Sequence, residues 1–89
     1  MGYKILIANE KILYKDLEKI PKKEVEKFWK AIEDFKKNPW PENLQVKKLQ
    51  NYKIADFRLR IGEYRILFDR DTEKNELVIF RILHRSKLY

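Results

Sequence analysis

Arginine is the residue type whose distribution in this 89-residue sequence most suggests chemistry. All six arginines lie between Arg58 and Arg85, whereas residues 1–43 contain ten lysines and no arginine. A guanidinium group is planar and always charged, and it binds phosphate or carboxylate through paired N–H donors. This segregation favours an anionic partner for the C-terminal half. The alternative is that the arginines only form salt bridges on strand surfaces.

Several polar residues of this half could form one RNA-binding surface. Two arginines alternate with apolar residues, and a third follows a short turn, so neighbouring strands would bring them to one rim of a sheet. Arginine planes and tyrosine rings stack on unpaired bases, and guanidinium groups pair with phosphates. The candidate residues are Arg58, Arg60, Arg65, Arg85, His84 and Tyr89.

These residue types could also support cleavage of RNA without a metal. In that reaction the 2′-hydroxyl attacks the adjacent phosphate and the 5′-oxygen leaves, so the enzyme must accept a proton from the 2′-hydroxyl, donate a proton to the 5′-oxygen and stabilise charge on phosphorus. Arginines suit the last task, and His84 or Tyr89 could transfer a proton, although a tyrosine pKa near 10 would have to be lowered. The single histidine excludes a two-histidine ribonuclease. His84 can equally be a packed or capping residue at a strand end.

The composition excludes several classes of protein. The net charge is +7, from 21 basic and 14 acidic residues, and there is no cysteine for a disulfide, a thiolate metal site or a nucleophile. Gly2 and Gly62 cannot make a glycine-rich phosphate loop. The acids at 69, 71 and 73 fit a solvated turn better than a calcium loop. We expect one domain over residues 1–89, in the cytoplasm, with no metal, cofactor or membrane segment.

The N-terminal half reads as a strand followed by two helices. Residues 3–8 predict a strand, and Asn9 is a suitable N-cap for a helix that ends before Pro21. Pro21 is well placed at the first position of a second helix. One face of that helix carries an apolar stripe, which favours core packing over a partner-binding face: Val25, Phe28, Trp29, Ile32 and Phe35.

After residue 43 the apolar period changes to two, which is typical of strands. Residues 44–50 indicate a possible short strand, and residues 56–61, 64–68 and 77–83 predict three more. Gly62-Glu63 is a tight turn, and residues 69–75 predict a loop. The order predicts an α+β fold: an N-terminal strand, an antiparallel two-helix hairpin, and a mainly antiparallel sheet of three to four further strands, with the helices on one face.

Two segments of this sequence resemble the RelE/ParE superfamily of toxins. The stretch from Phe57 to Phe68, FRLRIGEYRILF, is similar to the central motif of the family, and the stretch from Ile82 to Tyr89, ILHRSKLY, is similar to its C-terminal motif. Lys47-Lys48-Leu49 resembles the short strand before the central motif. The resemblance implies a RelE-like, microbial-ribonuclease-like fold in a toxin of a type II toxin–antitoxin system.

RelE-type members bind in the ribosomal A site and cleave messenger RNA there without a metal, and a RelB-like antitoxin neutralises them. By motif position, the resemblance implies catalytic roles for Arg65, Arg85 and Tyr89. It implies RNA-binding roles for Arg58, Arg60, Lys47, Lys48 and His84.

The sequence also departs from the RelE pattern. RelE-type members often carry lysine two residues before the position of Arg58, where this sequence has Asp56. The carboxylate removes a candidate general base or phosphate ligand and adds a repulsive charge. Two alternatives therefore stay open: a ParE-type toxin, which shares the fold but inhibits DNA gyrase, and a simple RNA-binding module.

Overall fold

The computed structural model describes residues 3–37, 46–48 and 55–87. Along the chain, the elements are β1 (Lys4–Ile7), α1 (Glu10–Glu18), α2 (Lys22–Lys37), β2 (Val46–Lys48), β3 (Phe57–Ile61), β4 (Tyr64–Asp71), β5 (Glu76–His84) and the 3₁₀ turn η1 (Arg85–Lys87).

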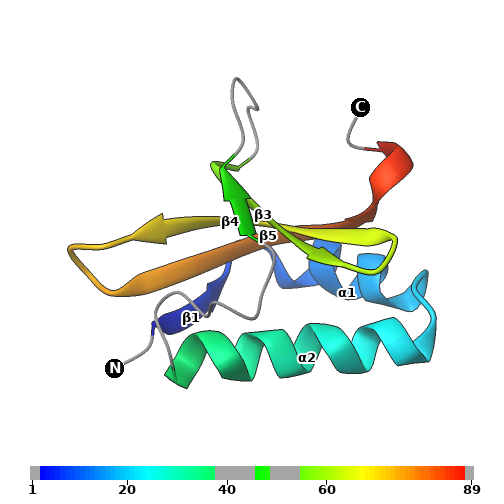
Figure 1. The fold of residues 1–89 in the computed structure, drawn as a ribbon, viewed down its shortest axis with the longest axis horizontal. Helices are drawn as coiled ribbons and strands as arrows, with labels where there is room; N and C mark the ends of the chain where they lie inside the picture. Colours follow the sequence, from blue (N-terminus) through cyan, green and yellow to red (C-terminus); the bar gives the residue numbers. More distant parts are fainter. Residues whose placement is uncertain (1–2, 38–45, 49–54, 88–89) are drawn as a thin grey trace.

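The strands form one mixed sheet in the order β1-β5-β4-β3-β2. β1 runs parallel to β5, and the other neighbours are antiparallel. Figure 1 shows both helices on one side of the sheet and η1 rising on the other side. The predicted α+β fold is therefore confirmed, with four strands after the helices.

The helix ends follow local signals in the sequence. The Asn9 side chain accepts a hydrogen bond from the Ile12 N–H at 3.1 Å, which confirms its predicted N-cap role. The Pro21 carbonyl accepts bonds from the N–H groups of Glu24 and Val25. Pro21 therefore stands one position earlier than predicted: it precedes Lys22, the first residue of α2, because its carbonyl opens the helical ladder.

The apolar stripe of α2 packs into the core, as predicted. Phe28, Ile32 and Phe35 are buried, and Val25 packs against them from the margin. Trp29 is the exception, since 40% of it is exposed and its ring contacts Phe28 edge to face at 4.9 Å between centroids. Trp29 therefore lies at the border of the helix–sheet interface.

The prediction of a loop over residues 69–75 was wrong for its first three residues. β4 continues to Asp71, because Asp69, Arg70 and Asp71 pair with β5 residues. Cross-strand pairing thus overrides the low strand propensity of these residues. The turn begins only after Asp71, whose Oδ1 accepts two backbone N–H bonds, and Asn75 adopts a left-handed φ of 54°.

The described helices are too short or too polar to cross a membrane.

Candidate nucleic-acid interface

The β3–β4 turn is the point around which the site is built. Ile61 pairs with Tyr64, so only Gly62 and Glu63 connect the two strands. Gly62 has a φ of +57°, as expected at the first central position of a II′ hairpin turn. A Cβ at this position would lie 2.7 Å from an oxygen of Glu24 in α2, so the helix approaches the turn closely.

Glu24 is a charged residue of α2, yet its carboxylate packs against the turn. Its side chain is only 17% exposed, and its Oε2 is buried without a hydrogen-bond partner. The reason is the missing side chain of Gly62, which leaves room for the carboxylate beside the turn.

Two arginines converge on the carbonyl oxygen of Gly62. Arg65 donates from Nη1 to the carbonyls of Gly62 and Tyr64, at 3.0 Å each. Arg60 donates from Nε to the Gly62 carbonyl at 3.4 Å. The predicted alternation is confirmed here, because Leu59 and Ile61 are buried while Arg60 is exposed. The turn carbonyls fix the directions of both guanidinium groups.

Arg85 reaches the same turn from β5. Tyr64 and His84 are paired residues of β4 and β5, so η1 starts beside the hairpin end. The Arg85 N–H donates to the Glu63 carbonyl at 2.8 Å, and its Nε lies 2.7 Å from Glu63 Oε2. We call Arg60, Arg65 and Arg85 the turn arginines.

The turn arginines concentrate positive charge at one place. Arg60 and Arg65 are direct cross-strand partners, and like charges in such a pair destabilise a sheet by several tenths of a kcal/mol. Arg60 has no carboxylate partner within residues 3–37 and 55–87. Arg85 forms an ion pair with Glu63, and both side chains of that pair are more than half exposed. The arrangement is suited to an anion with several oxygens.

The other predicted RNA contacts lie further along the sheet. Arg58 is half-buried, and its cross-strand partners are Lys47 on β2 and Leu67 on β4. Leu67 is fully buried yet outside the main core cluster, and the long stem of Arg58 can cover it. Lys48 pairs with Phe57 rather than with an arginine.

His84 combines packing with local hydrogen bonding. Its ring meets Tyr64 edge to face, with centroids 5.4 Å apart. Its Nδ1 accepts from the backbone N–H of Ser86 at 3.2 Å and lies 2.9 Å from the Ser86 hydroxyl. The neutral ring therefore carries its proton on Nε2, which is a donor. A capping role at the strand end is thus present, and RNA contact stays a prediction.

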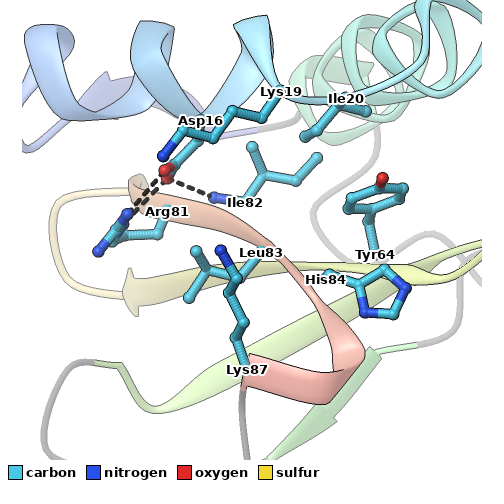
Figure 2. A pocket seen from close by; sticks show the side chains of 9 residues that line it. All are labelled: Asp16, Lys19, Ile20, Tyr64, Arg81, Ile82, Leu83, His84 and Lys87. Carbon is cyan, nitrogen blue, oxygen red and sulfur yellow. Dashed lines mark hydrogen bonds and ion pairs between the residues drawn. The ribbon is translucent and has the colours of Figure 1, made fainter.

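Arg81 proves to be structural. It donates to Asp16 of α1 from Nε at 2.9 Å and from Nη2 at 2.6 Å, and the Ile82 N–H also donates to this carboxylate at 3.3 Å (Figure 2). Asp16 is only 5% exposed. This contact was not predictable from the sequence, because the partners are 65 residues apart and no local pattern connects them. For Arg81, the salt-bridge alternative was right.

Two other expectations concern Tyr89 and Asp56. Tyr89 lies outside the described residues. Asp56 directly precedes β3 and donates its N–H to Asp69 Oδ1 at 2.6 Å. The five residues of β3 separate it from the turn, about 17 Å in extended chain. This distance exceeds the screening length of about 8 Å at physiological salt, so Asp56 opposes the turn arginines little.

A helix hairpin on one face of the sheet and arginines gathered at the β3–β4 turn define a toxin of the RelE/ParE type. The model of the family described as the ParE toxin of the type II toxin–antitoxin system parDE matches residues 13–89. The chain therefore belongs to this family, and it is a toxin of a type II toxin–antitoxin system.

Relatives with RelE names cover almost the whole chain. A Methanocaldococcus jannaschii protein that carries the name RelE1 is 30% identical over 87 residues, which are 97% of this chain and 96% of that protein. The fold is similar to RelB–RelE complexes from Methanococcus jannaschii, with a TM-score of 0.76, 27% identity and 94% of both chains covered. The archaeal RelE–RelB complex from Pyrococcus horikoshii has a TM-score of 0.76 and 25% identity. The match covers 98% of this chain and 99% of that chain. The RelBE2 complex from Mycobacterium tuberculosis has a TM-score of 0.72 and 27% identity. The match covers 96% of this chain and 100% of that chain.

Proposed function

We propose that this protein is a ribosome-dependent, metal-independent endoribonuclease that cleaves messenger RNA in the ribosomal A site and so inhibits translation. The observation that carries the proposal is the gathering of the turn arginines around Gly62 and Glu63. The similarity to RelE chains over at least 94% of the sequence supports the same reading.

The proposed chemistry needs charge stabilisation more than a strong base. When the 2′-oxygen attacks phosphorus, negative charge grows on the phosphate oxygens, and the N–H donors of Arg65 would stabilise it. The carbonyls of Gly62 and Tyr64 hold one edge of that guanidinium, so its geometry is set before RNA arrives. Arg85 would supply a second phosphate contact and assist protonation of the leaving oxygen. Tyr89 would stack on a base or take part in proton transfer.

The remaining predicted residues would hold the messenger strand along the sheet. Arg58 and Arg60 lie on β3, and Lys47 lies opposite Arg58 on β2, so a basic row crosses from one strand to the next. Lys48 and His84 complete the proposed RNA contacts. The ribosome would position the messenger for attack, so that residues 1–89 act as one domain that carries arginines into a site built largely by its target. A ribosomal target implies that the protein acts in the cytoplasm.

We also propose that a RelB-like antitoxin is the partner that keeps this toxin inactive. The three similar structures are antitoxin–toxin complexes. An acidic or amphipathic antitoxin segment that covers the turn arginines would offset part of the +7 charge and exclude RNA.

In vitro translation with toeprinting tests the nuclease proposal. Adding the protein should produce a cut in the messenger at the A site, and Arg65→Ala should abolish it. Arg70→Ala is the matched control, because Arg70 is exposed near the other end of β4, over the ring of Phe57. This control should retain cleavage. If wild-type protein leaves the messenger intact while translation continues, the nuclease proposal is refuted.

A second candidate function is inhibition of DNA gyrase, which the name of the matching family model favours. A supercoiling assay separates the two, because a gyrase inhibitor would block supercoiling without cutting messenger. A simple RNA-binding module would do neither, and its expression would not arrest growth.

A further inference from the structure

A second basic site borders the turn arginines along an open edge of β5. β1 pairs only with Glu76–Ile79, so the rest of β5 has no strand neighbour on that edge within the described ranges. A cleft of about 450 Å³ follows this edge, between the end of α1 on one side and η1 on the other (Figure 2).

Two lysines line the cleft from opposite walls. Lys19 is the C-cap of α1 and Lys87 belongs to η1; in Figure 2 Lys87 extends from η1 toward α1, and Lys19 runs along α1 toward Asp16. Neither has a carboxylate partner within residues 3–37 and 55–87. Asp16 is the one carboxylate among the described residues of the lining, and it already accepts from Arg81 and Ile82. The cleft is therefore electropositive.

One end of the cleft is lined by two aromatic rings and two aliphatic side chains. Tyr64 and His84 meet edge to face there, next to Ile20 and Ile82. Aromatic rings bind nucleobases by stacking, regardless of base identity. The Nε2–H of His84 adds a hydrogen-bond donor, because its Nδ1 is engaged with Ser86.

Strand addition to this edge is blocked at Ile82. A peptide that adds as a strand requires the free N–H groups of the edge. The Ile82 N–H is already bonded to Asp16, whose side chain is held by Arg81. At this position the side chains of the cleft, rather than the backbone of β5, are the groups that a ligand can bind.

We propose that this cleft binds one nucleotide of an RNA strand, with the base against Tyr64 and His84 and the flanking phosphates at Lys19 and Lys87. The proposal rests on the proposed function and deepens it. Tyr64 and His84 directly precede Arg65 and Arg85, so a strand with its scissile phosphate at the turn arginines passes around the end of β5 into the cleft.

Fluorescence anisotropy with a short labelled oligoribonucleotide and the full chain tests the phosphate contacts. Each single-strand phosphate contact contributes about 0.7 to the slope of log affinity against log salt. Lys19→Gln with Lys87→Gln should therefore lower the slope by about 1.4, which weakens binding roughly 25-fold at about 0.1 M salt. Lys11→Gln with Lys74→Gln makes the same charge change at exposed positions outside the cleft and should have a much smaller effect. Equal effects of the two pairs would overturn the proposal.

The base contact has its own readout. His84→Ala should weaken binding of the oligoribonucleotide but leave binding of inorganic polyphosphate unchanged, because polyphosphate has no base to stack. Equal losses for both probes would refute a base site. If the double variant Lys19→Gln/Lys87→Gln still binds RNA but no longer binds a RelB-like antitoxin, the proposal is overturned and the cleft is a protein-binding site.

The toeprinting assay keeps this test separate from the proposed function. Arg65→Ala removes the group proposed to act in cleavage but leaves every lining residue of the cleft in place. In one outcome, the wild-type protein leaves the messenger uncut while the Lys19→Gln/Lys87→Gln substitutions still weaken RNA binding. In that case the nuclease proposal fails and the nucleotide site stands.

Discussion

Replacing Asp16 with alanine should destabilise this protein more than any exposed charge substitution. The carboxylate accepts two bonds from Arg81 and one from the Ile82 N–H, and its side chain is 4% exposed. Removing one partner of a buried ion pair typically costs about 3–5 kcal/mol. Arg81 is 36% exposed, so water can solvate part of its charge in the variant. We therefore expect the lower end of the range, about 3 kcal/mol.

Replacing the arginine of this pair should lower the free energy of unfolding at least as much as replacing Asp16. Arg81→Met leaves the carboxylate of Asp16 buried, with only the Ile82 N–H as a donor, so we expect about 4 kcal/mol. In the double variant Asp16→Ala/Arg81→Met neither charge remains. Its loss should be smaller than the sum of the two single losses by about 2 kcal/mol, which is the coupling expected for residues in direct contact.

Urea unfolding followed by tryptophan fluorescence and circular dichroism measures these free energies. A loss of about 3 kcal/mol should also lower the Tm by roughly 12–24 °C in a domain of this size. Glu33→Gln is the control, because Glu33 pairs with Lys36 at the exposed surface and should cost less than about 0.5 kcal/mol. If Asp16→Ala and Arg81→Met each cost no more than this control, the pair does not anchor α1 to β5 and the reasoning is refuted.

Three further predictions concern the helix cap, the turn and the exposed ion pair of the site. Asn9→Ala should lower the free energy of unfolding by about 1 kcal/mol in urea titration, because the first turn of α1 loses its side-chain acceptor; no change would refute the cap role. Gly62→Ala should cost about 1–2 kcal/mol in the same assay, since its φ of +57° is left-handed; unchanged stability would contradict this. Glu63→Gln should tighten binding of a short oligoribonucleotide in anisotropy titrations, because the carboxylate no longer competes with phosphate for Arg85; Glu73→Gln, at the far turn of the sheet, is the matched control, and equal gains would argue for net charge alone.

Local patterns predicted most of the elements of the fold. Asn9 caps a helix through its own side chain, and Gly62 supplies the φ that a two-residue turn requires, so neither depends on distant residues. Alternation along β3 correctly assigned its two faces. The extent of β4 could not be read locally, because Asp69, Arg70 and Asp71 are strand residues only through their pairing with β5.

In the candidate site, too, some residues were indicated by the sequence and other roles were decided only by the fold. Residue types and motif resemblance indicated Arg60, Arg65 and Arg85, and the structure brings these three to one turn. Arg81 received no role from the sequence, because its carboxylate partner lies on a helix far away in the chain. Tyr89, outside the described residues, stays a prediction.

By itself, the sequence determined the charge of this protein, its order of elements and the side chains available for chemistry, because composition and periodicity are local properties. Only the tertiary structure decided which arginines share a site and which one holds the fold together. The physical reason is that a guanidinium group has the same donors everywhere, and its role depends on the acceptor that folding places beside it. Carbonyls of a hairpin turn hold Arg65 at the candidate site, whereas a buried carboxylate makes Arg81 part of the scaffold.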